Sequence, residues 1–480
     1  MTLQTDKLWI AGQPQTGLGP RLEVENPATG AVFATLNEAS VEQVDAAVRA
    51  AQAAFASGVW DDPEYRADTL LRLADLIEQH RDALGALLVD EVGTPVDLVG
   101  PLQVGTPISF FRYYAGLARI DRSIALGPDG NAAAPSESVV RFLPVGVAAA
   151  ITAYNYPLLL LALKVAPAFA AGCAVVILCS PQTPLATLAL GALMKEAGVP
   201  DGIVSVLVGG AEIGKALSEH PGIDKISFTG SVGVGSRVMQ QAGRGLKRVT
   251  LELGGKNAMI LLPDYDFEPT IAACHIRYLR NAGQGCASPT RILVHRPKMA
   301  AFIAATQRYF ATVKTGDPRT PGTLVGPLIS EAHRARVEGV LTRALLAGAK
   351  IVAGGGRPDL PQGWYLNPTL VAGADNHSEL ARDELFAPVA MVIPYDDIDE
   401  AVAMANDSDL GLSGFVFGPH EAAMAVAKRI RTGTVYVNGG GAIRMEAPMG
   451  GFKQSGIGRE YGEYGIREYL EPQHIQWSTA

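Results

Sequence analysis

The sequence predicts an α/β fold built around parallel sheets of the doubly wound type. Short apolar segments such as "VGVAAAIT", "CAVVILC", "VSVLVG" and "KISFTG" alternate with helical patterns, and strands buried on both faces of a parallel sheet are apolar throughout. Hydrophobic residues make up 48% of the 480 residues and charged residues 18%, which is typical of a compact enzyme. The alternation restarts after about residue 255 in "RILVH", "VAMVIPY" and "GTVYVN", so a second α/β domain is expected.

The N-terminal part of the chain supplies the elements that precede and begin this alternation. Residues 22–36 form a strand region, and helical patterns cover residues 41–55 and 65–91, the second of which ends at Gly93. Residues 143–179 are almost uncharged, and Lys164 is their only ionic residue. Prolines and glycines divide this run into pieces that are each short for a membrane span, so we predict a buried strand, a helix and a second buried strand instead.

Charge and cysteine usage argue against several classes of protein. The net charge of -8 argues against a nucleic-acid partner, because binding to phosphates needs a basic face. The cysteines show neither the spacing of a metal site nor a disulfide framework, so no metal is expected and a reducing compartment is favoured. The N-terminus "MTLQTDKLWI" lacks the basic and apolar regions of a signal peptide, so the expected location is the cytoplasm. The four cysteines are Cys173, Cys179, Cys274 and Cys286.

Four places carry side chains or backbone groups suited to chemistry, and each also has an ordinary structural explanation. Cys286 follows "NAGQG", where two glycines leave the thiol unscreened, as a nucleophile or any loop cysteine would be. Glu252 ends an apolar strand, which suits a general base or a buried ion pair. Asn155 follows a buried strand, where its amide can donate to an oxyanion or form a turn. Gly230 and Ser231 begin a helix, where backbone N–H groups suit a pyrophosphate or an ordinary turn.

Eight segments, taken in their order along the chain, resemble one enzyme family. From roughly Glu25 to Pro472 the sequence resembles the aldehyde dehydrogenases. The resemblance implies a Rossmann-like cofactor domain (1–125 and 145–254), an α/β catalytic domain (255–454) and a β oligomerisation arm (126–144 and 470–480). A homodimer or homotetramer follows by analogy. The matching segments are "YNYP", "KVAPAFAAG", "FTGSVGVG", "ELGGKN", "NAGQGC", "VGPLIS", "ELFAPV" and "PMGGFKQSGIGREYGEYGI".

The resemblance assigns roles to individual residues. Cys286 matches the nucleophile, Glu252 the general base that activates water, and Asn155 the side-chain half of an oxyanion hole that the Cys286 N–H completes. Lys164 matches a lysine near the catalytic relay. The positions that match cofactor contacts are Ile151, Thr152, Tyr154, Leu178, Gly230, Ser231, Val234, Leu253, Glu384 and Phe386.

The implied reaction is oxidation of an aldehyde to the acid through a thiohemiacetal and a thioester on Cys286. Hydride passes to NAD, or to NADP, and water releases the acid. An ordinary thiol has a pKa of about 8.5 and is mostly protonated at neutral pH, so local activation is expected, with helix termini and Glu252 as candidates.

The chain departs from the family where the adenosine ribose is usually held. The family reads Val-Val-Leu-Lys-Pro-x-Glu, whereas this chain reads "VVILCSP", with Leu178 in place of the lysine and Pro181 in place of the glutamate. This leaves the choice between NAD and NADP open. Two rival functions also stay open: a dehydrogenase that passes its acyl group to coenzyme A, and a non-catalytic homologue with impaired cofactor binding. The presence of Glu252 argues against the first. The changes at Leu178 and Pro181 slightly favour the second, but the intact set of Cys286, Glu252, Asn155 and Glu384 argues against it.

The residues that match the family's substrate tunnel are mainly apolar and suit aliphatic or aromatic aldehydes. Arg280 differs from the rest, because succinic semialdehyde dehydrogenases use an arginine at this position to bind a substrate carboxylate. The second arginine of that pair falls at Leu163. A semialdehyde therefore competes with the explanation of Arg280 as a surface or salt-bridged residue. The tunnel positions are Tyr156, Leu159, Leu160, Leu163, Arg280 and Met449.

Overall fold

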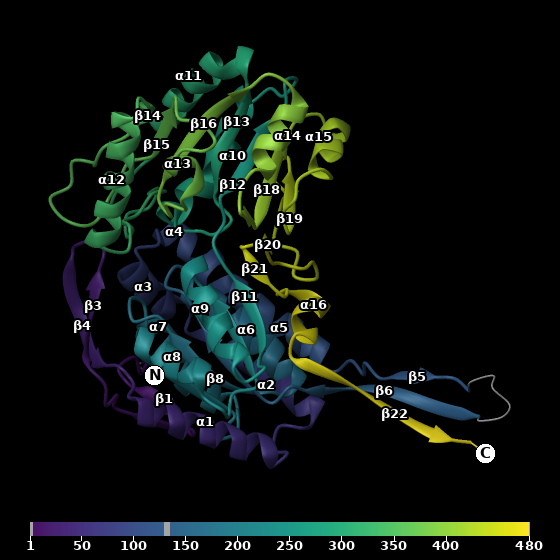
Figure 1. Ribbon diagram of the computed structural model, residues 1–480. Coiled ribbons are helices and arrows are strands. Elements are labelled where there is room, and N and C mark those ends of the chain that lie inside the picture. Colours follow the sequence, from purple (N-terminus) through teal and green to yellow (C-terminus); the bar gives the residue numbers. More distant parts are fainter. Residues whose placement is uncertain (1–2, 129–134, 480) are drawn as a thin grey trace.

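The computed structural model describes residues 3–128 and 135–479 and contains two large sheets, each with its own hydrophobic core (Figure 1). The first sheet is parallel through its five central strands, and β1, β2 and β21 extend it in antiparallel pairings. Its order is β2 (Gln13–Gln15), β1 (Leu8–Ile10), β9 (Val204–Val208), β8 (Ala174–Cys179), β7 (Val147–Ile151), β10 (Lys225–Thr229), β11 (Arg248–Glu252) and β21 (Gly456–Ile457).

The strand order reverses direction at β7. From β7 the chain moves outward through β8 and β9, then returns to the other side of β7 as β10 and β11. In doubly wound sheets, ligands bind outside the carboxyl ends of the strands at such a switch point. The connecting helices are α6 (Pro157–Ala171), α7 (Leu185–Glu196), α8 (Ala211–Glu219) and α9 (Val232–Gly243).

The apolar run at residues 143–179 folds as predicted, into strand, helix and strand. Every residue of β7 and β8 is buried, and so is nearly all of α6. Pro157 occupies the first turn of α6, and Gly172 ends it with a left-handed φ of 96°. Along the described part of the chain, no helix is both long and apolar enough to cross a membrane.

The N-terminal helices differ from the prediction in one place. The pattern at residues 65–91 is two helices, α2 (Pro63–Gln79) and α3 (Arg81–Val92), because His80 leaves the helical conformation with ψ of 13°. The polar sequence "EQHRD" spans this break. Because the helical periodicity of apolar residues continues on both sides of it, the prediction joined the two helices into one. The strand region 22–36 is a hairpin of β3 (Arg21–Asn26) and β4 (Ala31–Asn37). The remaining helices here are α1 (Val41–Ala56), α4 (Val96–Leu98), α5 (Thr106–Ala118) and the π-helix η1 (Val99–Gly105).

The second sheet confirms that strand and helix alternation restarts after the first. Its order is β14 (Lys350–Gly354), β15 (Thr369–Ala372), β16 (Val389–Tyr395), β13 (Pro289–His295), β12 (Asn257–Leu261), β18 (Ser413–Phe417) and β19 (Thr434–Val437), with β14 antiparallel and the other pairs parallel. Its helices are α10 (Ile271–Leu279), α11 (Met299–Phe310), α12 (Glu331–Leu346), α13 (Glu379–Arg382), α14 (Ile398–Asn406) and α15 (His420–Ala427). The predicted α/β fold class is therefore confirmed.

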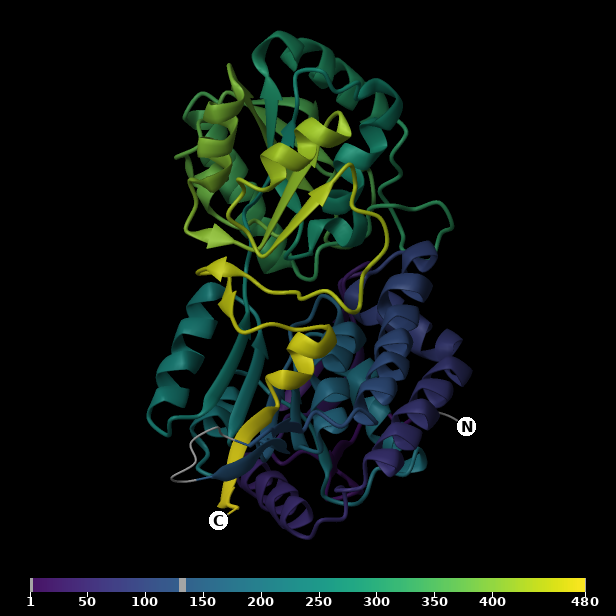
Figure 2. The same ribbon diagram turned by 90° about the vertical axis from the view of Figure 1, so that its right-hand side faces the viewer.

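A three-stranded sheet projects from the first unit. It consists of β5 (Ile124–Leu126), β6 (Ser136–Pro144) and β22 (Leu470–Ser478), and the C-terminus lies at its far end (Figure 1). Residues 129–134 and 480 of the predicted arm, and residues 1–2 of the predicted cofactor domain, lie outside the described residues. The chain after β19, yellow in Figure 2, pairs as β20 (Phe452–Lys453) with β17 (Leu410–Gly411), then as β21 with β11, and reaches the arm through α16 (Gly462–Arg467).

Candidate active site

The parallel strands bring several predicted residues to one edge of the first sheet. In the register of β7, β8, β10 and β11, Ile151 pairs with Leu178 and with Phe228, and Thr229 pairs with Glu252. The residues that follow these strands therefore leave the sheet at its carboxyl edge. Thr152, Asn155, Gly230 and Leu253, far apart in sequence, share this edge of the sheet.

Cys286 lies in the turn between the 3₁₀ segment η3 (Arg280–Gly283) and β13. The chain has four free cysteines. Cys286 is half-exposed, and the other three are buried. Asn281, Ala282 and Gly283 all have positive φ, and a Cβ on Gly283 would lie 2.1 Å from the Ala387 carbonyl oxygen. Three consecutive left-handed residues are costly unless the surrounding structure holds them. The turn therefore leaves the Cys286 thiol accessible, whereas the other three cysteines are packed in the interior.

The surroundings of Cys286 favour the neutral thiol. Burial, followed by the nearby carboxylates of Glu384 and Glu252, raises the pKa of Cys286 to about 12, and a hydrogen bond from the Ala287 N–H opposes this shift. Of the two activators considered from sequence, no helix begins at Cys286, and the charge of Glu252 acts against the thiolate. Glu252 can still assist by accepting the thiol proton, which is a different kind of activation.

Glu252 lies at the end of β11 and is buried, with 6% of its surface exposed. Its Oε1 atom has no hydrogen-bond partner in the part of the chain that the structure describes. Burial, and then the charge of Glu460, raise the pKa of Glu252 well above its usual range, whereas Lys164 and Arg459 oppose the shift. An unpaired buried carboxyl oxygen with a raised pKa is the property of a general base at neutral pH.

Lys164 forms an ion pair that the sequence did not reveal. Its Nζ donates to Oε1 of Glu460 over 2.8 Å, and the two side chains are 0% and 5% exposed. The partners are 296 residues apart in the chain. Glu460 has no local signal in "GREYGEYG", because only the return of the C-terminal segment past β11 brings it to α6.

Asn155 is held on both its backbone and its side chain. Its Nδ2 donates to the Gln284 carbonyl oxygen over 2.9 Å, and within residues 3–128 and 135–479 the second N–H of the amide has no acceptor. Gln284 is fully buried, and its side-chain oxygen accepts from the Ile329 N–H and from the Tyr154 hydroxyl. Asn155 therefore lies against the nucleophile loop, as an oxyanion donor must.

The start of α9 and the adjoining strand ends fit a dinucleotide. Ser231 is the N-cap of this 12-residue helix, and its hydroxyl accepts from the Val234 N–H over 3.4 Å. Leu253 packs so closely on the helix that a Cβ on Gly235 would lie 2.5 Å from it. The buried hydroxyl oxygens of Thr152 and Thr229 have no partner among the described residues, so both are free to bind a ligand. Thr229 was not predicted, although it ends the strand before Gly230.

Glu384 and Phe386 belong to the second unit and contact residues at the carboxyl edge of the first sheet. Oε1 of Glu384 accepts from the Gly255 N–H over 3.1 Å, and a Cβ on Gly254 would lie 2.3 Å from its other oxygen. Burial raises the pKa of Glu384 to about 7 against the effect of that hydrogen bond. Phe386 has a left-handed φ of 57° and packs edge-on against Tyr154 at 5.9 Å between ring centroids.

The predicted adenosine-ribose position is apolar. Leu178 is buried within β8 and lies 3.7 Å from the position a Cβ on Gly214 would take. The start of α7, which follows the loop after β8, is held by Glu91, a buried residue of α3 whose carboxyl oxygens accept the N–H groups of Leu185 and Ala186 at 2.8 and 3.0 Å. Glu91 was not predicted, because it is 94 residues from Leu185 in the chain.

The predicted substrate residues divide into two groups. Leu160 and Leu163 are buried within α6, whereas Tyr156, Leu159, Met449 and Arg280 are half-exposed. Among the described residues Arg280 has no ion-pair or hydrogen-bond partner, unlike its neighbour Arg277, which donates to the Gly439 carbonyl and lies 4.3 Å over the Tyr436 ring. Burial raises the pKa of Tyr156, and the Arg280 charge opposes that rise. The structure of the described residues therefore does not support the explanation of Arg280 as a salt-bridged residue.

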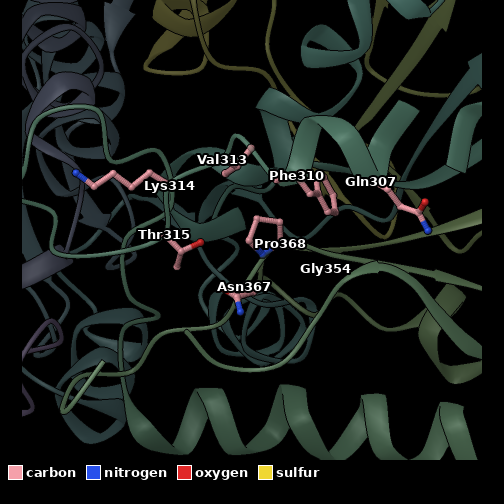
Figure 3. Close-up of a pocket in the computed structure, with 9 residues that line it drawn as sticks. Gln307, Phe310, Val313, Lys314, Thr315, Gly354, Asn367 and Pro368 are labelled. Atoms are coloured by element: carbon pink, nitrogen blue, oxygen red, sulfur yellow. The ribbon is translucent and has the colours of Figure 1, made fainter. Parts of the chain in front are cut away.

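One cavity lies away from these residues. It has a volume of about 560 Å³, and Figure 3 shows Phe310, Val313, Thr315 and Pro368 around it. None of the predicted site residues lines it. Across residues 3–128 and 135–479, no group of three or more His, Cys, Asp or Glu side chains is placed to hold a metal ion.

Comparison with known proteins gives one consistent family. Residues 14–475 match the model of the aldehyde dehydrogenase family. The geranial dehydrogenase of Castellaniella defragrans is 37% identical over 477 residues, which cover 98% of each chain. The 3-succinoylsemialdehyde-pyridine dehydrogenase of a Pseudomonas species is 38% identical over 472 residues, 97% of each chain.

Solved structures agree with this result. Aldehyde dehydrogenase C from Pseudomonas syringae, a variant with its cysteine changed to alanine and in complex with NAD+ and octanal, has a TM-score of 0.93 and 39% identity over 98% of this chain and 96% of its own. The NAD+ complex of a Bacillus cereus aldehyde dehydrogenase has a TM-score of 0.95 and 34% identity over 99% and 97% of the two chains. The chain therefore belongs to the aldehyde dehydrogenase family.

Proposed function

We propose that this protein oxidises an aldehyde to the carboxylic acid, with NAD as the hydride acceptor and Cys286 as the nucleophile. The observation that carries the proposal is that a clamped amide and a buried carboxyl oxygen without a partner among the described residues lie at the carboxyl edge of the first sheet, next to the loop from the second unit that carries the half-exposed thiol. NAD in the complexes of two similar enzymes supports this cofactor. The unsatisfied Thr152 and Thr229 hydroxyls and the N-terminus of α9 suit it.

The chain's own groups account for each step. Sγ of Cys286 adds to the carbonyl carbon after its proton passes to a base, and the oxygen gains the charge that Asn155 Nδ2 and the Cys286 N–H stabilise. When bound, NAD accepts the hydride from the carbon, which leaves a thioester on Cys286. Glu252 then takes a proton from water, the hydroxyl oxygen attacks the thioester, and the acid leaves while the thiol is restored.

We assign a separate role to each of the two sheets and to the projecting strands. We assign residues 1–125 and 145–254 to cofactor binding, residues 255–454 to the nucleophile and Glu384, and residues 126–144 and 470–480 to an arm that joins subunits into a homodimer or homotetramer. The projection of β5, β6 and β22 from the body supports the arm. Four free thiols support a cytoplasmic location.

Turnover of a simple aldehyde tests the proposal directly. Purified protein with NAD and an aliphatic aldehyde such as octanal should form NADH, and Cys286→Ala should remove this activity without unfolding the protein. The matched control is Cys274→Ala, which truncates a thiol buried in the second core. Retained turnover in Cys286→Ala, or no NADH from the wild type with any aldehyde, would overturn the assignment. Faster acyl release with coenzyme A than with water would favour the acylating alternative.

The substrate class has two candidates. The apolar residues Leu159, Leu160 and Leu163 suit aliphatic or aromatic aldehydes. Two relatives support this class, because one is a geranial dehydrogenase and the other binds octanal. The unpaired guanidinium of Arg280 favours a semialdehyde, whose carboxylate it would bind, and one relative acts on a semialdehyde.

A further inference from the structure

Three segments that are distant in sequence meet at the backbone carbonyl of Asn155. Gln103 Nε2 donates to this oxygen over 3.0 Å, and Asn281 Nδ2 donates to it over 3.1 Å. The side chain of Asn155 donates in turn to the Gln284 carbonyl. Gln103 lies on η1, whereas Asn281 and Gln284 belong to the loop that carries Cys286. The amide of Asn155 is therefore fixed at its backbone and at its side chain.

Gln103 is connected to the loop that carries Cys286 by two hydrogen-bonded routes. It is fully buried, and its Nε2 also donates to the Thr94 hydroxyl over 3.0 Å. The Thr94 hydroxyl donates to Oδ1 of Asn281 over 2.8 Å, so Gln103 is tied to Asn281 twice, through Thr94 and through Asn155. Its own Oε1 has no partner among the described residues. A buried amide oxygen without a partner costs stability.

The position of Gln103 in a π-helix strengthens this interpretation. Residues 99–105 form η1, and π-helical turns are rare and frequent at functional sites. From this π-helical turn the Gln103 side chain reaches both Thr94 and Asn155. On the other side, Asn281 keeps φ of 53° and ψ of 33°, a conformation that needs support from its contacts. Both departures from regular backbone thus converge on the Asn155 carbonyl.

We propose that Gln103 is a positioning residue for the oxyanion hole. It acts through Asn155 and contacts no reacting atom. By holding the Asn155 carbonyl against the nucleophile loop, it keeps the remaining amide N–H directed at the oxygen of the aldehyde bound to Cys286. Small displacements of an oxyanion donor cost large factors in rate, because the donor must match the transition state. This inference rests on the proposed function, in which Asn155 stabilises the oxyanion.

A double-mutant cycle tests the proposal. Gln103→Met keeps the volume and removes the donor, and Asn155→Ala removes the amide but keeps the backbone carbonyl that Gln103 contacts. We expect Gln103→Met to lower kcat about tenfold with little change in KM, and Asn155→Ala to lower it about 100-fold or more. In the double variant, the Gln103 change should cost less than about twofold further, because no amide is left to position.

The control is Gln43→Met, the same substitution at a buried glutamine of α1 whose Nε2 donates to the Thr16 carbonyl. Thermal unfolding of all variants separates lost stability from lost positioning. The Gln103 change should lower Tm equally with and without Asn155→Ala, while its effect on kcat vanishes. If the fold-losses in kcat of Gln103→Met and Asn155→Ala simply multiply in the double variant, Gln103 has only a structural role. The same conclusion follows if Gln43→Met lowers kcat as much as Gln103→Met does. If Asn155→Ala leaves kcat unchanged, the oxyanion assignment fails instead.

Discussion

Replacing Glu460 by glutamine should make the general base work at lower pH. Of the charged groups that act on Glu252, Glu460 is the one that raises its pKa most, and Lys164 opposes it from the other side of the pair. Glu460→Gln removes the negative charge and keeps an oxygen that can accept the Lys164 bond, now 2.8 Å long. The positive charge of Lys164 then acts on Glu252 without a neutralising partner.

The magnitude follows from the burial of all three side chains. A unit charge within about 4–6 Å of a buried carboxylate moves its pKa by about 1–3 pH units, so we expect a fall of about one pH unit for Glu252. Glu252 works as a base only when it has lost its proton. Activity therefore falls as pH drops through its pKa, and a lower pKa moves this acid limb to lower pH.

The assay is kcat measured against pH under conditions where deacylation limits turnover. Glu463→Gln is the matched control, since Glu463 is three residues further along, pairs with Arg122 and is not among the groups that shift Glu252. Breaking a buried ion pair costs about 3–5 kcal/mol, so Tm is measured alongside. An acid limb that stays in place or moves to higher pH in Glu460→Gln would refute the reasoning.

Three further variants test other parts of the site. Glu252→Gln should keep a burst of NADH but slow the steady rate, and equal loss of both phases in stopped-flow absorbance would place Glu252 earlier in the reaction. Arg280→Leu should raise KM for semialdehydes about tenfold or more and leave unsubstituted aldehydes of equal length nearly unchanged, whereas equal effects on both would return Arg280 to a structural role. Leu178→Lys should tighten NAD binding about tenfold or more in a fluorescence titration, since a hydrogen bond to a charged group is worth about 1.5–3 kcal/mol; a wild type with low-micromolar affinity and no gain in the variant would contradict this.

The sequence was most informative where chemistry depends on local pattern. Apolar strands, helix periodicity and the glycine turn before Cys286 predicted the fold class and singled out the half-exposed thiol. The helix break at His80 was not predicted, because the apolar periodicity continues across it. The hydrogen-bond partners of the predicted residues were not predicted either. Glu460 is 296 residues from Lys164, and Gln103 is 52 residues from Asn155, so only the folded chain brings them together. The direction of the Cys286 pKa likewise depends on which carboxylates pack around it.

The two ends of the proposed dinucleotide site differ in chemistry, and the difference bears on the non-catalytic alternative. The end near Cys286 has buried oxygens of Thr152, Thr229 and Glu252 that lack a partner among the described residues and are free to bind a ligand or water. The ribose end is apolar at Leu178, which packs within the core. Leu178 offers no hydrogen bond to a ribose, so this position bears on cofactor binding and not on the groups placed for the transition state. We therefore expect an enzyme with altered cofactor affinity rather than a non-catalytic protein.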